Sequence, residues 1–173
     1  MPFIRTSLPL LLLCLASLIL VSPMTSAYAV EKADMVVIDK RSARLYLTQK
    51  GRLLKAYSVA FGANPHGHKQ QRGDERTPEG DYVLDYKNDE SKYHLSIRIS
   101  YPNEADIARA KAQGLDPGDN IFIHGQPNGF GWMGWLNQKT NWTDGCIALK
   151  NTDMDEIWNA VDEGTKVRIV GFD

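Results

Sequence analysis

Short apolar runs separated by polar segments dominate the first half of the chain. Residues 35–38 and 44–47 are two such runs joined by a short polar stretch, a pattern that predicts a β-hairpin. Residues 53–61 and 81–86 have the same character and predict two further strands. The first half is therefore predicted to be mainly sheet.

Three more strands are predicted in the second half. Residues 93–101 place an apolar side chain at every second position, as a strand with one buried face does. Residues 121–123 form a short apolar run that predicts a buried strand ending at His124. Residues 166–170 predict the closing strand.

Two short helices are predicted between these strands. Pro102-Asn103 and Gly114 are start and stop signals for a helix over residues 104–113. Asn151-Thr152-Asp153 is typical of a helix cap and predicts a second helix that runs to Val161. Together with the strands, these helices predict a predominantly β domain.

Two long segments lack either pattern and are predicted to be loops. Residues 62–80 are rich in Gly, His, Arg and Pro, and residues 126–145 are rich in Gly, Asn and Trp. Long loops inside a compact domain are usually functional or mobile. We therefore expect functional residues in these loops or beside them.

The first 29 residues have the order of segments found in a secretory signal. Arg5 precedes an uncharged, Leu-rich run over residues 8–21, and Ala27-Tyr28-Ala29 is a small-x-small cleavage site. The run is shorter than the roughly 20 residues that a spanning helix needs. We therefore predict a signal peptide over residues 1–29 and a single exported domain over residues 30–173, with an uncleaved anchor as the alternative.

Composition and charge narrow the class of protein. The 173 residues include 43% apolar and 24% charged residues, as in an average globular domain. Lys and Arg number 20 and Asp and Glu number 21, which gives a net charge of −1. That balance argues against a nucleic-acid partner, since such proteins usually carry a basic face.

Cys146 is the one cysteine that remains once the signal peptide, which contains Cys14, is removed. A lone cysteine cannot form an intramolecular disulfide, so it is either a buried bystander or a thiol kept for chemistry. Because Cys146 follows Gly145, neighbouring backbone N–H groups could converge on an oxyanion formed there. The residues alone leave both interpretations open.

The four histidines differ in how well they could serve this thiol. His124 ends a predicted buried strand and is the best candidate for a base that takes the thiol proton. His94 falls on the polar face of a predicted strand. His66 and His68 lie in the first long loop, where no Cys or carboxylate spacing supports a metal site.

Three ordered motifs resemble the signature of L,D-transpeptidase catalytic domains of the YkuD type. They are His124-Gly125, the segment Thr143-Asp144-Gly145-Cys146-Ile147, and the upstream segment Thr77-Pro78-Glu79-Gly80-Asp81-Tyr82. The resemblance covers about residues 34–170. It implies a mainly β (α+β) fold, an L,D-transpeptidase-like β-sandwich or barrel with two short helices.

The resemblance also implies a mechanism. Cys146 would be the nucleophile, His124 the general acid and base, and the backbone N–H groups of Asp144, Gly145 and Cys146 the oxyanion hole. No metal or organic cofactor is implied. Family members act on peptidoglycan. For this chain, the resemblance implies a place in the periplasm or cell envelope of a Gram-negative-type bacterium.

Family members take a tetrapeptide stem as acyl donor. The cysteine attacks the carbonyl of the L-centre of meso-diaminopimelate, D-Ala leaves, and the stem is held as a thioester. A second diaminopimelate amine as acceptor gives a 3–3 crosslink, and a lysine of an outer-membrane lipoprotein gives a protein–wall tether.

Substrate-binding residues can be predicted from this chemistry. The stem carries several carboxylates, so a basic cleft is expected. The candidates are basic residues of the first long loop and of the 93–101 strand, Gly125 at the open strand end, and one tryptophan of the second loop: Lys69, Arg72, Arg76, Arg98, Gly125 and Trp142.

Two features depart from the family pattern. Asp144 stands where the most common motif has His, and its carboxylate would raise the pKa of the Cys146 thiol. The spacer between the two site motifs is long and holds Trp132, Trp135 and Trp142. We interpret it as a lid over the cysteine.

Two alternative functions stay open. A cysteine hydrolase that cuts diaminopimelate crosslinks or lipoprotein–peptidoglycan links would use the same residues with water as acceptor. The third possibility is a non-catalytic peptidoglycan-binding domain. It is suggested by Asp144, which departs from the common motif beside the cysteine.

Overall fold

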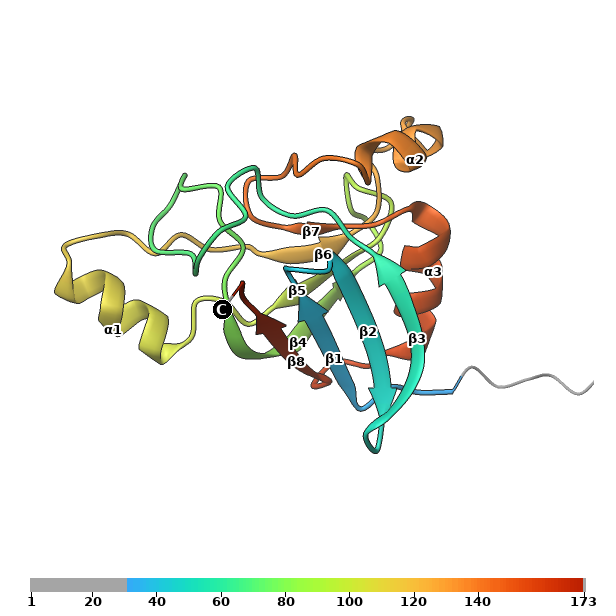
Figure 1. Ribbon diagram of the computed structural model, residues 1–173, viewed down its shortest axis with the longest axis horizontal. Coiled ribbons are helices and arrows are strands. Elements are labelled where there is room, and N and C mark those ends of the chain that lie inside the picture. Colours follow the sequence, from blue (N-terminus) through green and yellow to red (C-terminus); the bar gives the residue numbers. More distant parts are fainter. Residues whose placement is uncertain (1–30, 173) are drawn as a thin grey trace, which may run out of the picture.

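The computed structural model describes residues 31–172 (Figure 1). The predicted signal peptide, residues 1–29, lies outside the described residues. The predicted mainly β fold is confirmed, and eight strands are formed: β1 (Met35–Asp39), β2 (Arg44–Gln49), β3 (Arg52–Ser58), β4 (Gly80–Asn88), β5 (Ser96–Ile99), β6 (Phe122–His124), β7 (Ile147–Ala148) and β8 (Lys166–Val170).

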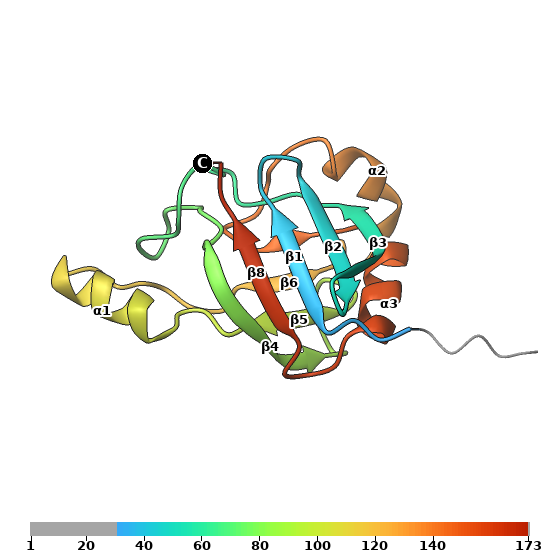
Figure 2. The ribbon, with the colours of Figure 1, turned by 60° about the horizontal axis from the view of Figure 1, so that its bottom comes forward.

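The strands form one curved sheet in the order β3-β2-β1-β8-β4-β5-β6-β7. The pairs β1–β8 and β6–β7 are parallel, and the others are antiparallel. Figure 2 shows β4, β8, β1 and β2 side by side, with β5 and β6 behind them. Backbone hydrogen bonds between Ala60, just after β3, and Ala148 in β7 join the two ends of the sheet at 2.8 and 2.9 Å.

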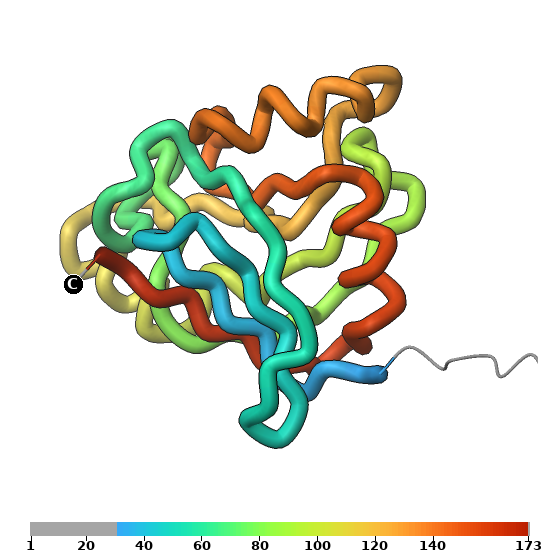
Figure 3. Tube along the Cα trace, turned by 45° about the vertical axis from the view of Figure 1, so that its right-hand side comes forward, coloured from blue at the N-terminus to red at the C-terminus, as the bar shows by residue number. Residues whose placement is uncertain are grey.

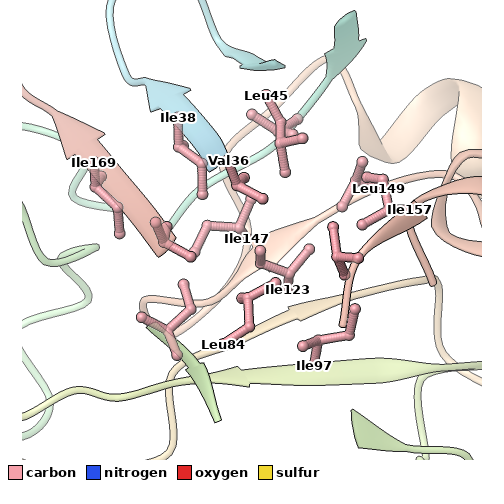
Figure 4. Close-up of a cluster of buried hydrophobic side chains, with 14 of the residues drawn as sticks. Val36, Ile38, Leu45, Leu84, Ile97, Ile123, Ile147, Leu149, Ile157 and Ile169 are labelled. Carbon is pink, nitrogen blue, oxygen red and sulfur yellow. The ribbon is translucent and has the colours of Figure 1, made fainter. Parts of the chain in front are cut away.

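The core fills the inside of this curved sheet. Strand side chains from opposite parts of the sheet point toward one another, and Leu149 and Ile157 complete the cluster (Figure 4). Ile157 belongs to helix α3 (Asn151–Ala160), which lies along one side of the sheet. Removing these side chains from water is the main favourable contribution to folding.

Helix α1 (Glu104–Ala112) matches the prediction closely. The Asn103 side chain accepts a hydrogen bond from the Asp106 N–H, and the Asp106 carboxylate accepts one from the Asn103 N–H, so a capping box begins the helix. Gly114 follows with a φ of 67°. The helix projects from the sheet on the side opposite α3 (Figure 1).

Two predictions about the helices need correction. The second long loop contains a 3₁₀ turn, Gly131–Met133, and a third short helix, α2 (Gly134–Asn137). Helix α3 begins one residue early, with Lys150 as its N-cap, because the Asn151 side chain bonds the Gln126 N–H at 2.8 Å instead of capping.

The strand predicted over residues 93–101 is only four residues long. His94 has a φ of 63°, which ends the regular strand conformation before Ser96. The His94 N–H donates to Asn128 at 2.8 Å, so a contact with the second long loop holds this turn. Alternation in the sequence cannot reveal such a turn, because the apolar pattern continues through it.

The first long loop is anchored by a buried lysine. The Lys40 ammonium, at the end of β1, donates to the carbonyls of Gly67 and Thr77 at 2.8 and 3.1 Å and to Glu79 at 2.7 Å. Figure 3 shows this loop folded back beside the ends of β1 and β8. The segment around Thr77, part of the third sequence motif, is therefore fixed from inside the fold.

Candidate active site

The β6–β7 pair places Cys146 and His124 on the same side of the sheet. Ile147 pairs with Ile123, and Ala148 pairs with His124. Cys146 is therefore opposite Phe122, two residues before His124, and alternate residues of a strand share a face. The Phe122 N–H donates to Cys146 Sγ at 3.5 Å, which ties the sulfur to this ladder.

Both side chains line one cavity of about 440 Å³. Asn88 at the end of β4, the segment Glu90 to Tyr93 between β4 and β5, and Trp142 also line it. A cavity of this size fits the range usual for small-ligand sites. The structure thus brings together the two residues to which the sequence motifs point.

The His124 ring is held in one tautomer. Its Nδ1–H donates to the Gly125 carbonyl at 2.7 Å, which leaves the Nε2 lone pair as the acceptor. Only 4% of the residue is exposed, and this burial lowers the pKa of His124, while the Gly125 carbonyl opposes the shift. Neutral imidazole with a free Nε2 is the form that can take a proton.

Two aromatic rings hold the imidazole in place. The Tyr93 centroid lies 4.6 Å from that of His124, and the Trp142 ring meets it edge-on at 5.9 Å. Tyr93 comes from the segment before β5 and Trp142 from the end of the second long loop. Two segments far from β6 in sequence therefore fix the orientation of the candidate base.

Cys146 is a protonated, half-buried thiol. Burial raises its pKa, the Phe122 N–H lowers it, and the Asp144 carboxylate raises it. Its Sγ donates to the Asn120 carbonyl at 3.7 Å, and no hydrogen bond joins it to His124 within residues 31–172. The thiol must therefore turn from Asn120 toward His124 before the proton can move.

The turn before Cys146 is tightly constrained. Thr143 Oγ1 donates to the Cys146 carbonyl at 2.7 Å and accepts the Gly145 N–H at 3.2 Å. Gly145 has a φ of 126°, and a Cβ there would lie 2.6 Å from the Arg76 carbonyl oxygen. Only glycine fits this position.

This turn changes the predicted oxyanion hole. Because the Gly145 N–H is used by Thr143, it is not free to stabilise an oxyanion. The N–H groups of Asp144 and Cys146 donate to no partner in the described chain. The geometry therefore favours these two as donors over Gly145.

Cys146 also opens on a second cavity, of about 490 Å³. Lys69, Arg72 and Glu75 of the first long loop line it, together with Asn120 and Asp144. Asp144 lines both cavities. A group bound to the sulfur could therefore be approached from either side.

Two of the three arginines predicted to bind substrate, Arg72 and Arg98, bond carboxylates of this chain instead. Arg72 lines the second cavity but bonds Asp116 at 2.8 Å, and Arg98 makes two bonds to Asp85 at 2.9 and 3.3 Å. Arg98 and Arg76 line neither cavity, and the Arg76 carbonyl packs against Gly145 instead. Lys69, 3% exposed, lines the second cavity and donates to Asp74 at 2.8 Å.

Gly125 and the second loop also differ from expectation. A Cβ on Gly125 would lie 2.8 Å from Asn151 Oδ1 and 2.9 Å from His94 Cβ, so its role is close packing and not an open strand end. Trp142 lines the first cavity as predicted, but Trp132 is 70% exposed and Trp135 58%. The loop covers the cysteine only through its last residues.

Sequence reasoning missed the wall formed by Glu90, Ser91, Lys92 and Tyr93. The alternating pattern placed Tyr93 inside a strand, and nothing in the sequence pairs this segment with His124. Within residues 31–172, no three or more His, Cys, Asp or Glu side chains are grouped so that they could hold a metal ion.

Comparison with known proteins identifies the family. Residues 33–169 match the YkuD family model, described as the L,D-transpeptidase catalytic domain. This chain belongs to that family. The fold and the resemblance inferred from the motifs are thereby confirmed.

Individual relatives agree with this assignment. The Escherichia coli (strain K12) protein named "Putative L,D-transpeptidase YafK" is 28% identical over 127 residues, which cover 71% of this chain and 44% of YafK. The crystal structure of the helical cell shape determining protein Pgp2 from Campylobacter jejuni matches with a TM-score of 0.60 and 26% identity, over 80% of this chain and 48% of Pgp2.

An L,D-transpeptidase from Mycobacterium smegmatis shares the fold, with a TM-score of 0.53 and 14% identity over 79% of this chain and 58% of that one. This chain spans about half the length of YafK and Pgp2. None of the helices within residues 31–172 has the length and apolarity that a membrane span requires.

Proposed function

We propose that this domain is a cysteine-dependent L,D-transpeptidase that acts on the tetrapeptide stems of peptidoglycan. The observation that carries the proposal is the shared cavity of Cys146 and His124, in which the buried imidazole keeps Nε2 free. Membership of the YkuD family supports the choice of substrate.

In the first half-reaction, His124 Nε2 takes the proton from Cys146 Sγ. The thiolate attacks the carbonyl of the L-centre of diaminopimelate, and the N–H groups of Cys146 and Asp144 stabilise the oxyanion. Protonated His124 gives its proton to the departing amine of D-Ala. The bond to D-Ala breaks, and the stem remains as a thioester on Sγ.

In the second half-reaction, an amine attacks the thioester carbonyl and loses a proton to His124. The thiolate leaves and is reprotonated, and the stem carries a new amide bond. The acceptor is a diaminopimelate amine, which gives a 3–3 crosslink, or a lysine of an outer-membrane lipoprotein. The second cavity supports transfer, because it offers an acceptor a route to Sγ while the donor stays in the first.

A hydrolase is the second candidate. The same second cavity is lined by charged and polar residues, and water that enters it could release the stem from the thioester. This enzyme would cut diaminopimelate crosslinks or lipoprotein links without forming new ones. A domain that only binds peptidoglycan would not form the thioester at all.

The test is mass spectrometry of the purified protein incubated with disaccharide-tetrapeptide. A transpeptidase gives a stem adduct on Cys146 with loss of D-Ala, followed by dimeric muropeptide. Cleavage of crosslinked muropeptide without dimer would identify the hydrolase. No adduct with either substrate would exclude both, and the Cys146→Ala variant supplies the blank.

The cellular setting follows from the same proposal. Residues 1–29 would direct export to the periplasm, where the substrate is found, and amino-terminal sequencing of the exported protein would show cleavage after Ala29. The description of Pgp2 as a helical cell shape determining protein suggests a role in cell shape. Deletion of the gene should then alter cell form.

A further inference from the structure

The segment Glu90 to Tyr93, which lines the first cavity together with the catalytic pair, carries two opposite charges. Glu90 and Lys92 lie on the segment between β4 and β5, both are exposed, and both line the cavity. Within residues 31–172, neither side chain forms an ion pair. In contrast, Arg72 and Arg98 are each bonded to carboxylates.

Asn128 of the second long loop holds this segment in place. Its Nδ2 donates to the Ser91 carbonyl at 3.0 Å, its N–H donates to the Lys92 carbonyl at 3.0 Å, and its Oδ1 accepts the His94 N–H at 2.8 Å. The Tyr93 carbonyl accepts the Gly125 N–H at 3.1 Å. The backbone that carries Glu90 and Lys92 is therefore fixed relative to His124.

The acyl donor has a group of matching charge. Meso-diaminopimelate joins the stem through its L-centre, and its side chain ends in a D-centre that bears one ammonium and one carboxylate. With the L-centre carbonyl at Cys146, this zwitterionic end must lie elsewhere in the cavity. An anion and a cation two residues apart on a held backbone complement both of its charges.

We propose that Glu90 and Lys92 form a specificity site for the zwitterionic D-centre of the acyl donor, with Lys92 on the carboxylate and Glu90 on the ammonium. The inference rests on the proposed function. It assigns recognition to residues outside the family motifs and makes Asn128 a positioning residue for them.

The experiment crosses two variants with three donors. Tetrapeptide donors carry the free zwitterion, a D-centre carboxamide or an N-acetylated D-centre amine, and intact-mass spectrometry gives the second-order rate of acylation of Cys146. Lys92→Met should slow acylation by the zwitterionic donor about fivefold and leave the rate with the carboxamide donor unchanged. Glu90→Gln should slow acylation by the zwitterionic donor and leave the rate with the N-acetylated donor unchanged.

Matched controls come from helix α1, away from both cavities. Lys111→Met and Glu104→Gln remove the same charges there and should leave all rates at the wild-type value. Lys92→Arg keeps the positive charge and should retain most of the wild-type rate with the zwitterionic donor. Equal losses on modified and unmodified donors would overturn the inference and leave the thioester mechanism standing. Failure of the wild-type protein to acylate with any donor would overturn the proposed function itself.

Discussion

The two walls of the first cavity are built in different ways. The wall with Cys146 and His124 is the β6–β7 ladder, where register and backbone hydrogen bonds set each position. The other wall, Glu90 to Tyr93, lies outside the strands and is held mainly by the side chain and N–H of Asn128. Groups that react lie on the ladder, and unpaired charges lie on the segment.

This difference fits the demands on each wall. Proton transfer and attack tolerate little displacement, so a strand pair supplies the rigidity. Recognition of a flexible peptide tolerates more, and a few side-chain hydrogen bonds suffice to preorganise it. We therefore expect changes on the ladder wall to affect the chemical step and changes on the segment to affect substrate selection.

The largest effect is expected for His124→Ala, on the ladder wall. Without Nε2 no base faces the thiol, and the acylation rate should fall about 10²–10⁴-fold. His66→Ala is the control, because the His66 ring packs against Phe172, tilted and with ring centroids 4.3 Å apart, and His66 lines neither cavity. A His124→Ala protein that folds and acylates at the normal rate would remove His124 from the mechanism.

The pH profile reports on the same residue. Burial lowers the pKa of His124, so the neutral form persists below the ordinary value of about 6.5. The acylation rate should stay constant as the pH falls to that value and decline only below it. A decline that begins above pH 6.5 would show that the imidazole is not the buried, desolvated group described above.

Gly145→Ala tests the backbone of the ladder wall. The new Cβ would meet the Arg76 carbonyl at 2.6 Å with φ at 126°, so we expect a loss of about 2 kcal/mol or more in the free energy of unfolding, together with loss of acylation. Gly51→Ala is the control. Gly51 has a φ of 78° with nothing within 4 Å, so its cost should be only about 1 kcal/mol in denaturant unfolding.

Asn128→Ala should loosen the wall formed by Glu90 to Tyr93. Removal of its side chain should raise KM for the tetrapeptide donor about tenfold and leave alkylation of Cys146 by iodoacetamide unchanged. Asn159→Ala, which breaks a bond to the Asp155 carbonyl within α3, serves as control. Slower alkylation in Asn128→Ala would mean that the two walls are not independent.

The smallest effect is expected for Asp144→Asn. The Asp144 carboxylate raises the pKa of Cys146, so its removal should shift the pH dependence of thiol alkylation to lower pH by less than about one unit. Asp89→Asn, at an exposed position outside both cavities, should produce no shift. A shift to higher pH would contradict the electrostatic account of this position.

Local signals in the sequence predicted those parts that local interactions form. Asn103 indicates the start of α1, and the cap bond that it accepts in the structure spans only three residues. The hairpin of β1 and β2 follows from two apolar runs and a short turn. The motif residues Cys146 and His124, far apart in the sequence, line one cavity in the structure.

Contacts between distant segments could not be predicted in this way. Arg98 lies on the polar face of its strand, as the alternating pattern predicts. The pairing of β4 with β5 places Asp85 beside it, and Arg98 bonds this carboxylate instead of facing the candidate site. Asn151 is a residue type that often caps helices, yet its side chain accepts a hydrogen bond from the Gln126 N–H instead. For both Arg98 and Asn151, a partner from another segment decides what the side chain does.

The sequence by itself determined most of the strands, the first helix, the family and the identity of the candidate nucleophile and base, because these depend on periodicity, capping and short motifs. Only the tertiary structure decided which charges stay unpaired at the site. Lys92 and Glu90 line the cavity because Asn128 of a distant loop holds their backbone there. Hydrogen bonds of this kind depend on the folded chain, since no local pattern joins residues so far apart.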